Sequence, residues 1–159
     1  GPNGLRTRCS VDSMGAMADE AHEHISIDAT PAHCFEVAID YERYPEFLPE
    51  VKKIRTLNRR GAEVDVQYEA EVVKVIKYTV HMKEEGPKKL SWSFIDGEFM
   101  KDNKGGWVLE DACHGTTKAT YNISVEVGML VPKTIVNALV DTQLPKLLEN
   151  FKKRIESQK

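Results

Sequence analysis

The sequence predicts an α+β domain in which one curved antiparallel sheet of about seven strands wraps around a long C-terminal helix. Three observations lead to this prediction. Apolar and polar residues alternate through the middle of the chain, an apolar stripe with helical spacing runs through the last third, and two short helical segments follow the first strand. A sheet with one dry face can bury that face against a single amphipathic helix.

Length and composition describe one globular domain. The chain has 159 residues, of which 41% are hydrophobic and 30% charged, as in ordinary soluble domains. Residues 1–16 begin with Gly-Pro and show no apolar period, so we expect them to be a leader left by expression, and the domain to span 17–159. The formal net charge of −3 disfavours a nucleic-acid partner, because phosphate binders usually carry a basic excess.

Cysteine usage suggests a compartment. With the leader set aside, Cys34 and Cys113 remain. No apolar run resembles a signal peptide or approaches the length of a membrane-spanning helix. We therefore expect both cysteines to be reduced, and the protein to be a cytoplasmic monomer.

The first elements are short. Ile25 and Ile27 face inward on a strand, and Thr30-Pro31 supplies an N-cap and a first-turn proline for the helix that follows. The next stretch, DYERYPEFLPEV at 40–51, contains two prolines that leave room for about one helical turn between them. We expect this turn to present Phe47 and Leu48 to the space beneath it.

The strands that follow are identified by their period of two. In residues 63–72 one face is apolar and the other is polar, which is the clearest strand in the chain. Residues 76–82, 90–94, 107–109 and 117–127 repeat the pattern. Short connections join them, and the glycines Gly97, Gly105 and Gly106 are expected in turns or bulges of an antiparallel meander.

The last third predicts one helix from about Val131 to the end. Apolar residues recur there at spacings of three and four and give one broad stripe. Pro145 cannot donate a backbone hydrogen bond to the carbonyl of Asp141, so we expect the helix to kink or loosen at that point.

This order of elements, together with several motifs, resembles the START-like helix-grip superfamily. Within it, the chain is similar to the bacterial polyketide cyclase/dehydrase-type and coenzyme Q-binding branch. The motifs that carry the resemblance are Thr30-Pro31 ahead of Phe35, YERYPEFLPEVKKI, GEF…GGWVLE over 97–110, and VPKTIVNALVDTQLPKLLENFKKRIE at the end. The match covers residues 21–158.

The resemblance implies a cavity between the sheet and the long helix that holds a hydrophobic small molecule, such as a lipid, an isoprenoid quinone or a polyketide-like compound. The short helical segment at 41–48 would then act as a gate at its mouth. The expected lining residues are Tyr44, Phe47, Leu48, Val66, Tyr68, Ala70, Tyr78, Val80, Trp92, Phe94, Trp107, Leu109, Tyr121, Val136, Leu139 and Val140. Alternatively, the large aromatic side chains fill the centre as an ordinary core.

Few residues in the sequence indicate catalysis or metal binding. His22 and His24 alternate on the face opposite Ile25, so they are expected to point to solvent rather than to bind a metal. Cys34 lies among apolar residues, and the neighbours Cys113 and His114 point apart, which disfavours a nucleophile–base pair. We therefore expect no catalytic residue, no metal site and no cofactor. A cavity tyrosine would instead hydrogen-bond a ligand oxygen.

The sequence thus favours a protein that binds or transports a hydrophobic small molecule, with transient membrane contact as a further possibility. An aromatase/cyclase enzyme is the first alternative, because enzymes of the superfamily polarise a polyketide carbonyl with a few polar groups. A ribosome-associated interaction protein is the second alternative, and the acidic net charge disfavours it.

Overall fold

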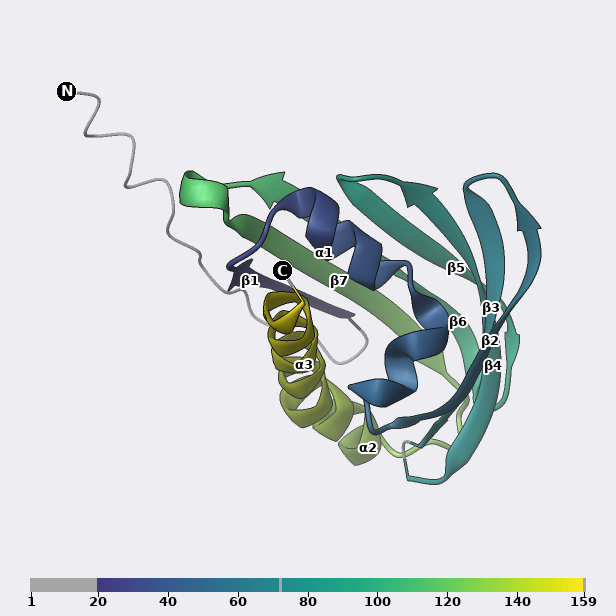
Figure 1. The fold of residues 1–159 in the computed structure, drawn as a ribbon. Helices are drawn as coiled ribbons and strands as arrows, with labels where there is room; N and C mark the ends of the chain where they lie inside the picture. Colours follow the sequence, from purple (N-terminus) through teal and green to yellow (C-terminus); the bar gives the residue numbers. More distant parts are fainter. Residues whose placement is uncertain (1–19, 72, 159) are drawn as a thin grey trace.

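The computed structural model, which describes residues 20–71 and 73–158, confirms the predicted fold class. A seven-stranded antiparallel sheet has the order β1-β7-β6-β5-β4-β3-β2 and curls around the C-terminal helices (Figure 1). Its strands are β1 (Glu20–Ile27), β2 (Val51–Arg60), β3 (Glu63–Glu71), β4 (Val75–Glu85), β5 (Lys89–Gly97), β6 (Met100–Asp111) and β7 (Thr117–Val127). The expected leader, residues 1–16, lies outside the described residues.

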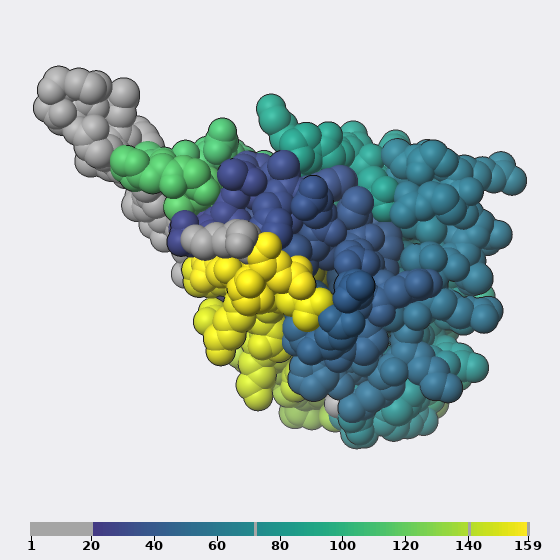
Figure 2. Space-filling model, viewed as in Figure 1, coloured from purple at the N-terminus to yellow at the C-terminus, as the bar shows by residue number. Residues whose placement is uncertain are grey.

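The helical elements cover one face of this sheet, except for the short turn at 113–115, which connects β6 to β7 (Figure 1). They are α1 (Pro31–Ala38), the 3₁₀ helices η2 (Tyr41–Glu46) and η3 (Cys113–Gly115), α2 (Lys133–Ala138), the π-helical turn η4 (Leu139–Gln143) and α3 (Leu144–Ser157). Figure 2 shows η2 lying directly beside α3 on the viewed face. Among the described residues, no helix is both long enough and apolar enough to cross a membrane.

The start of α1 follows the predicted capping pattern. Thr30 is the N-cap, and its Oγ1 accepts a hydrogen bond of 3.3 Å from the backbone N–H of His33. Pro31 occupies the first turn, where the proline nitrogen sacrifices no helical hydrogen bond. This helix buries Cys34, Val37 and Ala38 and covers one end of the sheet.

The second short helix begins earlier than predicted. It is the 3₁₀ helix Tyr41–Glu46, with Pro45 inside it, and Phe47 follows as its C-cap. The prediction of a turn between the two prolines is therefore wrong. Pro45 lies near the end of this 3₁₀ helix and, having no backbone N–H, donates no hydrogen bond there. Contacts with the sheet hold the helix in place, since the Tyr41 hydroxyl donates to Glu84 Oε2 at 2.7 Å.

The long C-terminal helix is divided as Pro145 suggests. A π-helical turn, Leu139–Gln143, separates α2 from α3, and Pro145 lies in the first turn of α3. A π turn widens the helix by one residue and is a common way to absorb a disrupted hydrogen-bond ladder. The apolar stripe of α3 buries Leu144, Leu148, Phe151 and Ile155.

Two glycines predicted for turns or bulges lie inside strand β6 instead. A Cβ atom at Gly105 would come within 2.2 Å of the Asn122 backbone oxygen, and one at Gly106 within 2.5 Å of the Leu90 oxygen. The neighbouring strands therefore approach β6 more closely than any side chain allows. This close approach lets the sheet curl tightly around the helices.

Candidate ligand cavity

A cavity of about 540 Å³ lies between the sheet and the C-terminal helices. Its volume is within the range of small-molecule sites, about 300–1,000 Å³. Strands β3 to β7 supply most of its wall. The segment after η2 supplies Leu48, and α2, η4 and α3 supply the opposite side through residues such as Val136, Leu139 and Phe151.

Most of the residues expected from the sequence do face this space. The expected residues on the cavity wall are Tyr44, Leu48, Tyr68, Ala70, Tyr78, Val80, Trp92, Trp107, Tyr121, Val136 and Leu139. The strand residues among them share the inner face because side chains alternate along each strand. The side chain of Val140 lies outside the described part of the structure.

Four expected residues do not line the cavity. Val66 and Leu109 are buried in the hydrophobic core and do not reach the cavity wall. Phe94 pairs with Val80 directly before a register shift between β5 and β4, and its ring lies beside Gly97.

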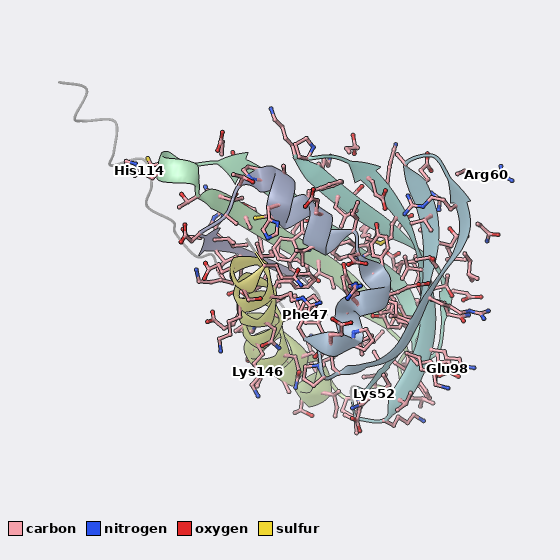
Figure 3. The ribbon with its side chains drawn as sticks, in the orientation of Figure 1. Phe47, Lys52, Arg60, Glu98, His114 and Lys146 are labelled. Atoms are coloured by element: carbon pink, nitrogen blue, oxygen red, sulfur yellow. The ribbon has the colours of Figure 1, made fainter. Side chains whose placement is uncertain are left out.

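Phe47, which was predicted to line the cavity, also lies away from its wall. Its ring packs edge-to-face on Phe151, with a centroid distance of 5.0 Å, and the Arg154 guanidinium lies 5.1 Å from its centroid. Figure 3 shows Phe47 between η2 and α3. The η2 segment therefore closes one side of the cavity and is fastened to α3, and it does not form the mouth.

The mouth lies at the other end, and sequence reasoning missed its residues. They come from the β3–β4 turn, the β5–β6 turn, the segment before α2 and the start of α2: Val73, Lys74, Phe99, Met100, Leu130, Val131, Pro132 and Ile135. Several are exposed. The apolar run Met129-Leu130-Val131 is the signal that could have identified this region, because turns seldom carry consecutive large apolar residues.

Aromatic rings form much of the inner wall. Tyr68 and Tyr78 are stacked, with centroids 4.9 Å apart and an interplanar angle of 8°. Tyr121 packs on Trp107 at 4.8 Å and on Trp92 at 5.6 Å. Rings packed on one another in this way form a rigid, mostly apolar surface.

A few polar atoms interrupt this apolar wall. Tyr44 donates to the Ala38 carbonyl at 2.5 Å, and the Trp92 indole donates to Asn103 Oδ1 at 2.9 Å. The hydroxyls of Tyr68, Tyr78 and Tyr121 have no partner among the described residues. No side-chain oxygen or nitrogen there is both fully buried and unpaired, so these three hydroxyls open onto the cavity.

Burial keeps these hydroxyls protonated. It raises the pKa of Tyr68, Tyr78 and Tyr121 well above the usual value for tyrosine, because a phenolate is poorly stabilised in apolar surroundings. Each is therefore a hydrogen-bond donor at neutral pH. An oxygen acceptor on an otherwise apolar molecule is the partner that such donors suit.

The residues considered for other chemistry lie apart from the cavity wall. His22 is exposed, and His24 is hydrogen-bonded to Thr120 Oγ1 at 3.0 Å. Cys34 is a free buried cysteine, and burial raises the pKa of its thiol. Cys113 lies in the connection between β6 and β7. No group of three metal-binding side chains occurs in the described ranges.

The curved sheet, the C-terminal helices and the cavity between them define a START-like helix-grip protein. The chain belongs to the polyketide cyclase/dehydrase and lipid transport family, because the model of that family matches residues 27–152. The resemblance to the START-like superfamily and to its polyketide cyclase/dehydrase-type members is thereby confirmed. A search among curated proteins finds no match.

Solved structures share the fold at low sequence identity. A START superfamily protein from Mycobacterium smegmatis has a TM-score of 0.78 and 16% identity, covering 89% of this chain and 99% of its own. The Zhui aromatase/cyclase from Streptomyces sp. R1128 has a TM-score of 0.80 and 12% identity, covering 87% and 94%. A STAR-related lipid transfer protein from Xanthomonas axonopodis has a TM-score of 0.70 and 14% identity, covering 91% and 89%.

Proposed function

We propose that this protein binds and carries one hydrophobic small molecule in the cavity. One observation carries the proposal: the wall is almost wholly apolar and encloses about 540 Å³, while three tyrosine hydroxyls open onto it. Burial of ligand surface would supply the affinity, at about 25 cal/mol per Å². The tyrosines would select molecules that carry one or two oxygen acceptors, as lipids, isoprenoid quinones and polyketide-like compounds do.

The family supports the same class of ligand, since it includes lipid transport proteins as well as cyclases. The bound molecule would be this protein's main partner. We also propose that the protein is a cytoplasmic monomer that needs no cofactor and no nucleic acid.

Native mass spectrometry of the purified protein, followed by solvent extraction, tests the proposal directly. A bound apolar compound with few oxygen atoms is the expected result. Binding of the fluorescent apolar probe N-phenyl-1-naphthylamine provides a second measurement that does not depend on a retained ligand. If the probe fails to bind and no compound is extracted, the proposal is wrong.

A matched pair of variants on strand β7 locates the binding. Val125 lines the cavity, whereas its neighbour Ser124 points to the opposite face of the sheet because side chains alternate. Val125→Trp fills part of the cavity and should weaken probe binding about tenfold or more, with the fold retained. Ser124→Trp is the control and should bind as the wild type does. Equal binding by both variants would place the probe outside the cavity.

An aromatase/cyclase activity is a second candidate for the same cavity. It is favoured by the three protonated tyrosine hydroxyls, which are suited to polarise a ketone. Incubation with a short poly-β-ketone mimic should then give a cyclised product, and Tyr78→Phe should lower the rate while leaving binding intact. Binding without conversion would favour the carrier function.

A further inference from the structure

Four large apolar side chains are exposed around the mouth of the cavity. Met129 is 94% exposed, Leu130 91%, Val73 69% and Phe99 46%. We call these four residues the apolar rim. Val73, Phe99 and Leu130 also line the cavity, so the rim borders its opening.

The rim comes from three separate connections that lie together. They are the β3–β4 turn, the β5–β6 turn and the loop between β7 and α2, and α2 and the β3–β4 turn lie at the same lower end of the molecule in Figure 1. The backbone N–H of Gly128 donates to the Phe99 carbonyl at 3.0 Å, which joins two of these connections. Lys74 Nζ lies 4.0 Å from the Phe99 ring centroid, which joins the third.

This cluster of exposed apolar side chains indicates an interaction site. Scattered exposed apolar residues are normal, but a cluster of them around an opening usually marks an interaction site. Separate protruding loops provide no groove for a peptide or for a helix. They do suit a soft surface into which several side chains insert independently, as the interface of a lipid bilayer allows.

The charges around the rim favour binding of the rim to an anionic surface. Lys74, Lys101 and Lys133 have no ion-pair partner in the described part of the chain. Three acidic groups at this end are already engaged: Glu71 pairs with Lys52 at 3.3 Å, Asp102 pairs with Lys104 at 3.9 Å, and Glu98 accepts the backbone N–H of Lys77 at 2.9 Å.

Further carboxylates near this end include the exposed Asp141 of η4, Glu126 and Glu50. Glu126 points away from the cavity, because its neighbours Val125 and Val127 line it, and Glu50 lies on the cavity wall itself. Neither of these two is placed on the rim. The lysines beside the rim are therefore available to lipid phosphates, although the protein as a whole is acidic.

We propose that the apolar rim inserts into the interface of an anionic lipid bilayer, with Lys74, Lys101 and Lys133 against the headgroups, so that the cavity opens directly into the membrane. Docking depends on the rim and on these lysines, and not on the proposed function. The further consequence, that a ligand passes between membrane and cavity without crossing water, rests on the proposed function.

Flotation of the full chain with vesicles tests the docking. Vesicles of phosphatidylcholine with phosphatidylserine should carry the protein upward, and vesicles of phosphatidylcholine alone should carry much less. Leu130→Asp should lower the bound fraction about tenfold or more, because it replaces an inserted apolar side chain by a charge. Ile95→Asp is the matched control, since Ile95 is 47% exposed but does not line the cavity mouth.

Two further measurements separate insertion from loss of folding. Both variants should keep the circular dichroism spectrum of the wild type. In addition, Met129→Trp should shift its fluorescence to shorter wavelengths when anionic vesicles are added, because the indole then leaves water. Lys133→Glu should weaken binding to anionic vesicles only, and added salt should have the same effect.

Several results would overturn the proposal. They are failure of the wild type to float with either vesicle, equal flotation of Leu130→Asp and wild type, or a dimer in solution that Leu130→Asp dissolves while vesicles bind nothing. The last result would assign the rim to a second copy of this chain. Vesicle binding by a protein that fails every ligand test would uphold docking and overturn the proposed function, so the two failures are distinguishable.

Discussion

The space between the sheet and the C-terminal helices has two ends that differ in kind. At the end covered by α1, the side chains of Ile27, Cys34, Ala119, Leu148 and Ile155 are buried against one another in the core. At the end covered by α2 and η4, the facing side chains surround a cavity. The same strands run through both ends.

Strand β7 shows what makes the difference. Its first inward residues, from Thr117 to Tyr121, are buried, whereas Ile123, Val125 and Val127 are only partly buried. The alternation along the strand does not change between the two halves. What changes is how closely a helix packs on the inward face. Helix α1 has three buried residues of its own, whereas α2 has only Val136. An inward face is therefore a core only where a helix packs closely on it.

The largest effect on stability is expected for a matched pair of leucines in the C-terminal helices, and this pair tests the difference between the two ends. Leu148 is buried at the packed end and Leu139 lines the cavity. Leu148→Ala should lower the free energy of unfolding by about 2–5 kcal/mol, as a new void forms among close-packed neighbours. Leu139→Ala should cost about 1 kcal/mol or less. Urea unfolding followed by circular dichroism measures both values, and equal losses would contradict the division into two ends.

A smaller effect is expected for the two kinds of tyrosine. Tyr44 donates to the Ala38 carbonyl at 2.5 Å, so Tyr44→Phe removes a buried hydrogen bond and should cost about 0.5–1.5 kcal/mol of stability. Tyr121→Phe should leave stability unchanged, because that hydroxyl opens onto the cavity, and should change which ligands bind. Thermal unfolding and ligand extraction of the two variants compare these roles, and a stability loss in Tyr121→Phe alone would reverse the assignment.

The smallest effect concerns the outer face of the sheet, remote from both ends. His81 bonds Asp65 Oδ1 at 2.7 Å and Glu63 Oε1 at 2.6 Å. The hydrogen bond with Asp65, then that with Glu63, raises the pKa of His81 above its ordinary 6.5. The pKa of Asp65 is lowered, first by Asn58 and then by His81, and the pKa of Glu63 is lowered by His81.

The pH dependence follows from these directions. The contribution of His81 is complete below about pH 6.5 and is lost as the pH rises through its raised pKa, while the contribution of the two carboxylates is lost as the pH falls through their lowered pKa values. The melting temperature of the wild type should therefore decline above pH 6.5 relative to that of His81→Gln, by less than the effect of Tyr44→Phe. Parallel curves for the two proteins would contradict this.

The fold could be predicted from the sequence because the period of two identifies each strand and the helical stripe identifies the C-terminal helix. The same period identified Tyr68, Tyr78 and Tyr121 as inward. Both Val66 and Val80 are buried in the core, but only Val80 lines the cavity. The alternation could not separate them, because it specifies the face of the sheet and not how closely a helix packs on that face.

Other parts of the cavity depend on contacts that no local pattern contains. The Phe94 ring lies beside Gly97, and the Phe47 ring packs on Phe151 of α3. The mouth comes from loop residues such as Leu130, whose neighbours in space are far away in the chain. Turn residues carry no periodicity, so their positions around an opening appear only once the strands are paired.

The π-helical turn Leu139–Gln143 has a consequence for inheritance and redesign. It holds one residue more than an α-helical turn, and each residue of an α-helix advances the direction of a side chain by about 100°. Deleting one residue there would restore a regular α-helix, and α2 and α3 would keep the faces that they present to the cavity, because the wider π turn already absorbs the extra residue. A single-codon deletion would thus change the cavity wall only at the turn itself, where Leu139 and Gln143 line the cavity, and would leave the packed end as it is.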